Sequence, residues 1–349
     1  MSTMSDPACP VCRAGTSTPF ATIDGFGYFE CGACGSLHID PQVLAAIDAG
    51  EQPLGAYADR YWKQERKAAQ ERAAGSSLCC AGEAILYCRR PVERFLDVGT
   101  GPGYLLERLQ ALLDPEARIF HGVEKFPPAY AVDCPNFDVG DVAGLDGSFD
   151  AGTCIEVIEH LTPAVLDHIA RALRRLSRKG SLWLLNSGMP EYVKHEDPGY
   201  LDPTRRGHIV SYSIRGLEAI FAPHGFRISP LPGKSYASIA EFDPDPAPED
   251  FSERIYRPLP ENDALLARCG LLRQATIQSA RASYYFGGYL ERTRWALSLD
   301  RELAELRDQH ARQLRELAQQ YEHELAELRA QLPQAADAGD AAAPGGRSG

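Results

Sequence analysis

The chain has 349 residues, of which 44% are hydrophobic and 24% are charged, a composition typical of a folded globular protein. The sequence has no apolar run of about 18 residues, the length that a membrane helix requires. Its N-terminus lacks the basic and apolar regions of a secretory signal, so we expect a cytoplasmic protein. The net charge of −12 disfavours binding along a nucleic-acid backbone, because basic patches supply most of that affinity.

Two cysteine pairs lie near the N-terminus. Cys9 and Cys12 form one C-x-x-C pair, and Cys31 and Cys34 form the other. This spacing predicts a tetrahedral zinc site with four thiolate ligands. Such a site is closed to substrates, so its role is structural. A segment this short, with few apolar residues, could hardly fold without the metal, and we therefore predict a zinc ribbon over residues 1–40.

A strand–helix alternation fills residues 93–240, after a helical connector at 41–92. It predicts an α/β fold with a doubly wound, mostly parallel sheet and helices on both faces. Residues 241–298 combine a Pro-rich, acidic excursion with a helix, and we expect 228–262 to lie outside the core. The apolar runs that predict strands are 94–98, 118–124, 149–155 and 181–186, with helical stretches at 103–113 and 162–178.

The C-terminal helix carries one regular stripe. Apolar or ring-bearing residues recur from Leu303 to Leu332 in steps of 3, 4 and 4. This period predicts a coiled coil over 299–332, through which the protein would form a homo-oligomer. A single helix packed on its own domain would show the same stripe. Pro333 is expected to end the helix, and residues 333–349 have the composition of a disordered tail.

The most informative segment is a glycine loop, in which Gly99, Thr100, Gly101 and Gly103 follow the first strand of the alternation. Glycines permit positive φ and let a ligand approach the backbone closely. The third glycine comes one residue earlier than in the dinucleotide pattern G-x-G-x-x-G, and Asp97 precedes the loop. That carboxylate would repel a pyrophosphate but attract an amino-acid ammonium group. The loop therefore favours S-adenosylmethionine (SAM) over NAD.

Two further acids follow later strands. Glu124 ends the second apolar run, where an acidic side chain is placed to accept hydrogen bonds from ribose hydroxyls. Asp141 lies in a Gly-Asp-Val segment before the next strand and could face the adenine amino group. The alternative is that Asp141 only caps a turn.

These segments resemble the successive motifs of class I SAM-dependent methyltransferases over about residues 90–230: D-V-G-T-G-P-G, the acid at Glu124, G-D-V, and F-D-A-G-T-C-I-E-V-I-E-H-L. The resemblance implies that Asp97 and the three glycines line the methionine end of SAM, that Glu124 binds ribose and that Asp141 lies beside adenine. Methyl transfer requires alignment of acceptor, methyl and sulfur rather than a protein nucleophile. The cysteine pairs also resemble those of bacterial sugar and natural-product methyltransferases, although the later segments do not match the C-terminal domain of the sugar C-methyltransferases.

A polar E-x-x-E-H segment leaves three roles open. Glu156, Glu159 and His160 follow the third strand, and His208 precedes a later helix. In the first role, Glu156, which would also contact SAM, and His160 only orient the cofactor and the turn. Alternatively, His208 or His160, with Glu159 beside them, acts as a general base on a substrate hydroxyl. In the third role all four bind Mg²⁺, a set that resembles the metal site of Hen-type small-RNA 2′-O-methyltransferases, and some quinone O-methyltransferases are similar.

The sequence therefore favours an enzyme, a SAM-dependent O-methyltransferase acting on a hydroxyl of a small molecule or glycan. RNA 2′-O-methylation, sugar C-methylation and a non-catalytic scaffold built from the zinc ribbon and the coiled coil are the alternatives. An RNA substrate would need a basic groove beside His208, where the local basic residues are Lys194, Arg205 and Arg206.

Overall fold

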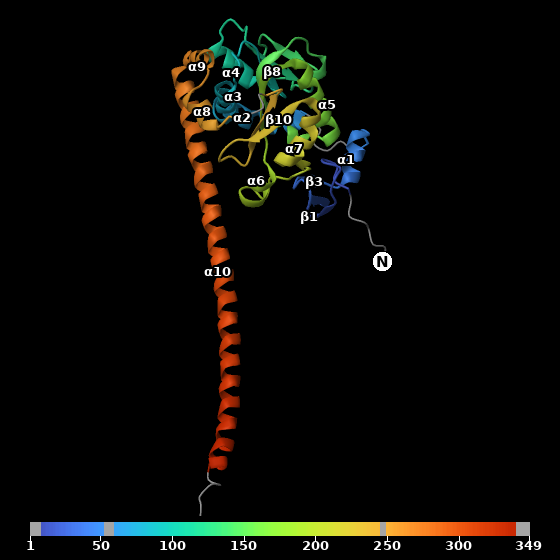
Figure 1. Cartoon of the computed structure of the whole chain (residues 1–349). Helices are drawn as coiled ribbons and strands as arrows, with labels where there is room; N and C mark the ends of the chain where they lie inside the picture. Colours follow the sequence, from blue (N-terminus) through green and yellow to red (C-terminus); the bar gives the residue numbers. More distant parts are fainter. Residues whose placement is uncertain (1–7, 52–58, 245–248, 340–349) are drawn as a thin grey trace, which may run out of the picture. The chain divides into compact units, whose positions relative to one another are not determined.

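The computed structural model describes residues 8–51, 59–244 and 249–339 (Figure 1). The chain divides into two compact units, Met1–Gly288 and Tyr289–Gly349. In the part of the chain that the structure describes, no helix is both long and apolar enough to cross a membrane.

A seven-stranded sheet forms the centre of the first unit, in the order β10-β11-β8-β7-β4-β5-β6. β11 runs antiparallel to both of its neighbours, whereas the pairs from β8 to β6 are parallel. The predicted α/β fold with a mostly parallel sheet is confirmed. The strands are β4 (Phe95–Val98), β5 (Phe120–Glu124), β6 (Phe137–Val139), β7 (Phe149–Ile155), β8 (Ser177–Asn186), β10 (Phe226–Pro230) and β11 (Ala237–Phe242).

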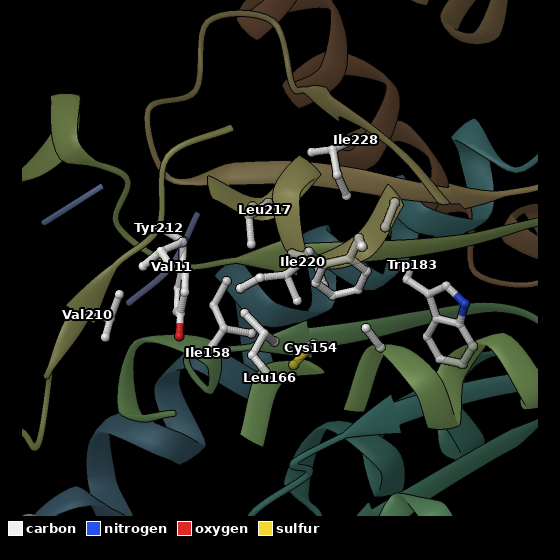
Figure 2. Close-up of a cluster of buried hydrophobic side chains, with 14 of the residues drawn as sticks. Val11, Cys154, Ile158, Leu166, Trp183, Val210, Tyr212, Leu217, Ile220 and Ile228 are labelled. Atoms are coloured by element: carbon white, nitrogen blue, oxygen red, sulfur yellow. The ribbon is translucent and has the colours of Figure 1, made fainter. Parts of the chain in front are cut away.

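Helices cover both faces of this sheet, and Figure 1 shows α3 and α4 on the opposite side of β8 from α5. Successive side chains of a strand point to opposite faces, so Leu182 and Leu184 of β8 join one buried cluster and Trp183 and Leu185 join the other. The first cluster includes residues of α3 (Ser76–Tyr87), α4 (Tyr104–Leu113), α8 (Phe251–Tyr256) and α9 (Pro260–Ala267). The second includes residues of α5 (Pro163–Leu176) and α7 (Ile214–Phe221), as Figure 2 shows around Trp183.

The N-terminal segment forms a small antiparallel sheet with strand order β1-β2-β3-β9. Its first three strands are β1 (Ser17–Ile23), β2 (Phe26–Cys31) and β3 (Leu37–Ile39). The fourth strand, β9 (Val210–Ser211), comes from the middle of the chain. We refer to residues 8–39 as the cysteine-rich hairpin.

Shorter helices connect these parts. Residues 41–92 contain α1 (Pro41–Asp48), α2 (Asp59–Ala74) and α3, and residues 52–58 lie outside the described part. Further along are α6 (Pro190–His195) and the 3₁₀ turns η1 (Val142–Gly144), η2 (Ile158–His160) and η3 (Ala222–His224).

The expectation that residues 228–262 lie outside the core is wrong for 228–242 and for α8, whose Ile255 is buried in the cluster described above. Residues 228–242 complete the central sheet as the end of β10 and all of β11, with Ile228 and Ile239 buried. The Pro-rich acidic run that suggested an excursion, E-F-D-P-D-P-A-P-E-D-F, begins only at Glu241, at the end of β11. The pairing of β11 with β8 is a long-range contact that local composition does not encode.

The chain ends in one continuous helix, α10 (Gly270–Gly339). The sequence predicted a separate helix up to residue 298 and a helix end at Pro333, and both boundaries are wrong in the structure. A proline removes one backbone donor, and the rest of a long helix keeps its remaining hydrogen bonds. Of the predicted tail, residues 340–349 lie outside the described part.

Candidate functional site

The glycine loop joins β4 to α4 at the carboxyl edge of the sheet. β5 lies on one side of β4 and β7 on the other, so the loop is at the topological switch point, where open α/β sheets bind ligands. Gly99, Gly101 and Gly103 have φ values of 72°, 57° and 82°. A Cβ on Gly99 would lie 2.5 Å from Val157, and one on Gly103 would lie 2.5 Å from Val132. Backbone conformation and close packing therefore both require glycine here.

A cavity of about 930 Å³ opens beside this loop. Its volume is near the upper end for small-molecule sites. His160 and His208 line it, whereas Gly103 and Glu159 are not part of its wall. The other predicted site residues on the wall are Asp97, Gly99, Thr100, Gly101, Glu124, Asp141 and Glu156.

Asp97 presents a buried carboxylate at this cavity. The residue is 3% exposed, and its Oδ1 accepts a hydrogen bond of 2.7 Å from the hydroxyl of Thr153. Burial raises the pKa of Asp97 to about 6, an effect that the Thr153 hydrogen bond partly opposes. The carboxylate is therefore mostly ionised at neutral pH but poorly solvated. A ligand cation placed beside it would be strongly attracted.

Glu124 lies at the end of β5 and contacts the glycine loop directly. Its Oε2 accepts the backbone N–H of Gly101 at 2.9 Å, and its Oε1 accepts that of Phe126 at 2.9 Å. Each carboxylate oxygen has two lone-pair sites. Glu124 therefore keeps acceptor capacity for two hydroxyls of a ligand.

Asp141 caps a turn and also lines the cavity. Its carboxylate accepts the backbone N–H of Ala143 at 3.0 Å, and it pairs with Lys125 Nζ at 3.0 Å and His168 Nε2 at 3.1 Å. Burial raises the pKa of this carboxyl, but these three contacts outweigh burial and lower it to about 2. The structure thus shows the turn cap that the sequence left as an alternative, at a position where the carboxylate also faces the ligand space.

Only three of the four predicted Mg²⁺ ligands come together. Ligand atoms of Glu159, His160 and His208 lie within 4.8 Å of one another, and the rings of the two histidines are 4.8 Å apart. Among the described residues, Glu156 is not part of this group, so the four-residue set is corrected. Glu156 itself has a φ of 54°, in the left-handed region, and lines the cavity instead.

Hydrogen bonds to carbonyl groups orient both histidines. The Nδ1 of His208 lies 2.7 Å from the carbonyl oxygen of Tyr200, and that of His160 lies 3.2 Å from the carbonyl oxygen of Gly207. A carbonyl can only accept, so Nδ1 carries the proton and Nε2 carries the lone pair in each ring. Burial lowers the pKa of His160 to about 4 and that of His208 to about 3. Both imidazoles are therefore neutral at physiological pH.

Glu159 is fully buried behind the histidines. Among the residues that the structure describes, neither carboxylate oxygen has a hydrogen-bond partner of normal geometry, and Oε1 lies 3.9 Å from His208 Nε2. Burial, together with the nearby charge of Glu156, raises the pKa of Glu159 well above its usual value. The nearby hydroxyls of Tyr200 and Ser187 act to lower the pKa of this carboxyl. An ionised Glu159 carboxylate would face the lone pair of His208 Nε2, and burying that charge without a partner costs free energy. A proton on the carboxyl, or a cation held between these groups, would remove that cost, so the trio fits a metal ion.

Residues 58–231 match a protein-family model described as a methyltransferase domain. The chain is a SAM-dependent methyltransferase. The match argues against the non-catalytic scaffold that the sequence left open. A search of curated proteins found no match for this methyltransferase.

Three solved structures are similar to part of this methyltransferase. An amino pentose methyltransferase of calicheamicin biosynthesis from Micromonospora echinaspora is 18% identical, with a TM-score of 0.38, over 54% of this chain and 99% of that chain. DesVI from Streptomyces venezuelae is 15% identical, with a TM-score of 0.36, over 49% of this chain and 94% of that one. Human N-acetylserotonin methyltransferase is 14% identical, with a TM-score of 0.40, and the match covers 56% of this chain and 61% of the human protein.

The four N-terminal cysteines form a compact cluster. The sulfurs of Cys9 and Cys34 are 3.9 Å apart, those of Cys12 and Cys31 are 3.6 Å apart, and all four lie within 4.8 Å of one another. A tetrahedral zinc ion with Zn–S bonds of about 2.3 Å requires sulfur–sulfur distances of about 3.8 Å. The backbone N–H groups of Ala33 and Cys34 each approach the Cys31 sulfur at 3.4 Å. The cluster therefore fits a four-thiolate metal site.

Several residues at the site were not predicted from the sequence. Arg72 of α2 lines the cavity, and Thr153 and Tyr200 orient Asp97 and His208. Arg72 and Tyr200 belong to no motif, and they reach the site through packing of elements distant in sequence. Thr153 lies within the F-D-A-G-T-C-I-E segment, but its hydrogen bond to Asp97 forms only where β7 pairs with β4. Arg205 and Arg206 also line the cavity, although the sequence singled them out only as basic residues for an RNA groove.

Proposed function

We propose that this methyltransferase transfers the methyl group of SAM to a hydroxyl of a small molecule or glycan, with His208 as the group that receives the hydroxyl proton. The observation that carries the proposal is the neutral imidazole of His208 on the cavity wall, with Nδ1 tied to the Tyr200 carbonyl. This tautomer offers Nε2 as a proton acceptor beside the space for an acceptor molecule. His160 packs against the ring and orients it.

The low pKa of His208 favours a particular order of events. A base with a pKa near 3 does not deprotonate a free alcohol. As the acceptor oxygen attacks the methyl carbon, however, the oxygen becomes positively charged and its proton becomes strongly acidic. The C–O bond then forms while the C–S bond breaks, the sulfur leaves as a neutral thioether, and the proton passes to Nε2. A carbon acceptor would need a much stronger base, which disfavours sugar C-methylation.

The cofactor half of the site follows from its acids. In this proposal the carboxylate of Asp97 binds the ammonium group of SAM, Glu124 binds the ribose hydroxyls, and Asp141 lies near adenine. Support comes from the burial of Asp97 and from the spare acceptor capacity of Glu124 beside the glycine loop. The Gly99–Gly103 backbone would then lie against the methionine part of the cofactor.

A metal-assisted reaction is the second candidate, and the fully buried carboxylate of Glu159 beside two neutral imidazoles favours it. In that case Glu159, His160 and His208 would hold Mg²⁺ or a similar ion, which would lower the pKa of an acceptor hydroxyl. An RNA acceptor is less well supported. Each of the three expected basic residues is paired with a carboxylate: Lys194 with Glu30, Arg205 with Asp202 and Arg206 with Asp197.

We also propose that the four N-terminal cysteines bind zinc in a structural role. The sulfur–sulfur distances of 3.6 and 3.9 Å support this, because they are close to the edges of a zinc–thiolate tetrahedron. The zinc would stabilise a segment that has few apolar side chains of its own.

The apolar stripe of α10 supports a homo-oligomer formed through residues 299–332. Leu306, Leu314, Tyr321 and Leu328 are each more than half exposed in the single chain. Apolar residues repeated along a charged helix become buried when a second copy packs against them. A coiled coil between copies of this chain is the interface that we propose.

Label transfer tests the main proposal. Purified protein is incubated with methyl-labelled SAM and size-separated cell extract, with and without EDTA, and compared with His208→Gln. We expect label in low-mass or glycan fractions, loss of transfer in His208→Gln, and unchanged affinity of that variant for S-adenosylhomocysteine. Label in RNA, or full activity of His208→Gln, would refute the proposal. Loss of transfer in EDTA while the zinc content stays constant would favour the metal-assisted reaction.

A further inference from the structure

The segment that carries His208 is paired with the cysteine-rich hairpin. β9 begins two residues after His208 and runs antiparallel to β3, with Leu37 opposite Ser211 and His38 opposite Val210. The N–H of Ile39 extends the pairing by donating to the carbonyl of Ile209 at 2.9 Å. The small N-terminal sheet is therefore completed by backbone from the methyl-transfer site.

A buried tyrosine of the hairpin contacts His208 itself. Tyr28 on β2 is 0% exposed, and its hydroxyl donates a hydrogen bond of 2.8 Å to the carbonyl oxygen of His208. The contact joins residues that are 180 positions apart in the sequence. A phenylalanine would fill the same space as the tyrosine ring, so the hydroxyl contributes only this hydrogen bond. The bond therefore anchors the backbone of His208 specifically.

Two further polar contacts of His208 come from its own loop. Its backbone N–H donates to the carbonyl of Asp202 at 3.1 Å, and its Nδ1 donates to the carbonyl of Tyr200 at 2.7 Å. These two contacts set the shape of the loop and the orientation of the ring within it. Tyr28 adds a contact from a different element, which ties the loop to the rest of the protein.

The sulfur cluster stabilises the part of the hairpin that makes these contacts. β2 ends at Cys31, and β3 starts at Leu37, shortly after Cys34. The hydroxyl of Ser213, just beyond β9, donates to the carbonyl of Cys34 at 2.6 Å. A metal bound by the cysteines would therefore hold together both strands that reach the His208 segment.

Apolar packing seals the same junction. Val11 of the hairpin belongs to one buried cluster with Val210 and Tyr212, as Figure 2 shows. At Gly216, the start of α7 approaches the hairpin so closely that an added Cβ would lie 3.0 Å from Val11 and 2.2 Å from the hydroxyl of Ser36. The hairpin is thus packed rigidly against the site rather than attached by a linker alone.

We propose that the cysteine-rich hairpin is a positioning element of the methyl-transfer site and that Tyr28 is the positioning residue that holds His208 in place. The inference rests on the role of His208 proposed above. An in-line transfer tolerates little misplacement, and an error of about 1 Å in a group at the reacting centre can reduce the rate about a hundredfold. Because the Tyr28 hydrogen bond fixes the backbone carbonyl of His208, it limits the displacement of the His208 ring relative to the reacting atoms.

The test is Tyr28→Phe in the full-length protein, which removes one hydroxyl and keeps the ring. Three properties are measured: affinity for S-adenosylhomocysteine by calorimetry, amide hydrogen exchange of peptides covering 200–212 by mass spectrometry, and the imidazole ¹⁵N signals of His208, assigned with His208→Gln. We expect affinity within about twofold of the wild type, exchange in 200–212 at least tenfold faster, and displaced His208 signals. The rate of label transfer should fall about tenfold.

Ser17→Ala is the matched control. Ser17 is also buried in the hairpin, and its hydroxyl bonds His38 Nε2 at 2.9 Å, entirely within the hairpin. This variant should leave the His208 signals and the exchange of 200–212 unchanged. Unchanged His208 signals in Tyr28→Phe would overturn the inference, as would equal changes in Ser17→Ala or loss of cofactor binding in Tyr28→Phe. These readouts do not depend on turnover, so they are separate from a failure of the proposed function, which full activity of His208→Gln would reveal.

Discussion

Replacement of Asp97 by asparagine separates cofactor binding from stability. The substitution keeps the shape of the side chain and the oxygen that accepts from Thr153, but it removes the negative charge. Burial raises the pKa of Asp97 from 3.8 to about 6. The folded protein therefore binds this proton more tightly than the unfolded chain does, and the ligand-free enzyme loses stability as the pH rises from about 4 through about 6.

The magnitude follows from that pKa shift. A rise of about two units corresponds to about 3 kcal/mol of unfavourable free energy for the ionised carboxylate at pH 7. Asp97→Asn removes this cost, so the ligand-free variant should be at least as stable as the wild type at pH 7. A hydrogen bond to a charged group contributes about 1.5 to 3 kcal/mol, so affinity for S-adenosylhomocysteine should fall roughly 10- to 150-fold.

The assay combines calorimetric titration with S-adenosylhomocysteine and urea unfolding of the ligand-free protein at pH 7. Both are repeated with Thr153→Val, which removes the donor to Asp97 but leaves the carboxylate in place. Unchanged affinity of Asp97→Asn would refute the assignment of this carboxylate to the ammonium group. A large loss of stability in the same variant would refute the view that its charge is a cost in the ligand-free state.

Further predictions concern pH, packing, metal and assembly. Below about pH 6 the affinity of the wild type for S-adenosylhomocysteine should fall about tenfold per pH unit, because Asp97 becomes protonated. The affinity of Asp97→Asn should not change with pH over this range. The same pH dependence in both proteins would contradict the prediction. Gly152→Ala should destabilise the fold by more than about 2 kcal/mol in urea unfolding, because its Cβ would lie 2.4 Å from both the Leu96 carbonyl and Trp183; wild-type stability would contradict it. Zinc removal by a chelator, followed by metal analysis, should speed amide exchange in 200–212, and unchanged exchange would argue against a metal-stabilised hairpin. Deletion of 299–349 should lower the oligomeric mass measured by light scattering and leave cofactor affinity unchanged. An unchanged oligomeric state would mean that residues 299–332 do not form the interface between copies of the chain.

Local patterns in the sequence predicted much of this protein. Alternating apolar runs and helical stretches located β4, β5, β7 and β8, because each element carries its own periodicity. The acid and three glycines at 97–103 indicated the cofactor type, since they lie within one turn of chain and their chemistry is local. The cysteine pairs likewise indicated a metal cluster, because the two C-x-x-C spacings are short-range features. In each case the residues that determine the feature are neighbours in the sequence.

What the sequence could not predict depends on segments that meet only after folding. The pairing of β3 with β9, the contact of Tyr28 with His208 and the place of β11 in the central sheet all join residues far apart in the chain. Glu156 is another case, because the E-x-x-E-H spacing suggested convergence, whereas the described residues that group with His208 are Glu159 and His160 alone. Spacing and composition determined the fold class and the chemistry of the loop. Only the tertiary structure decided which distant side chains surround His208, because packing and long-range backbone pairing have no local sequence pattern.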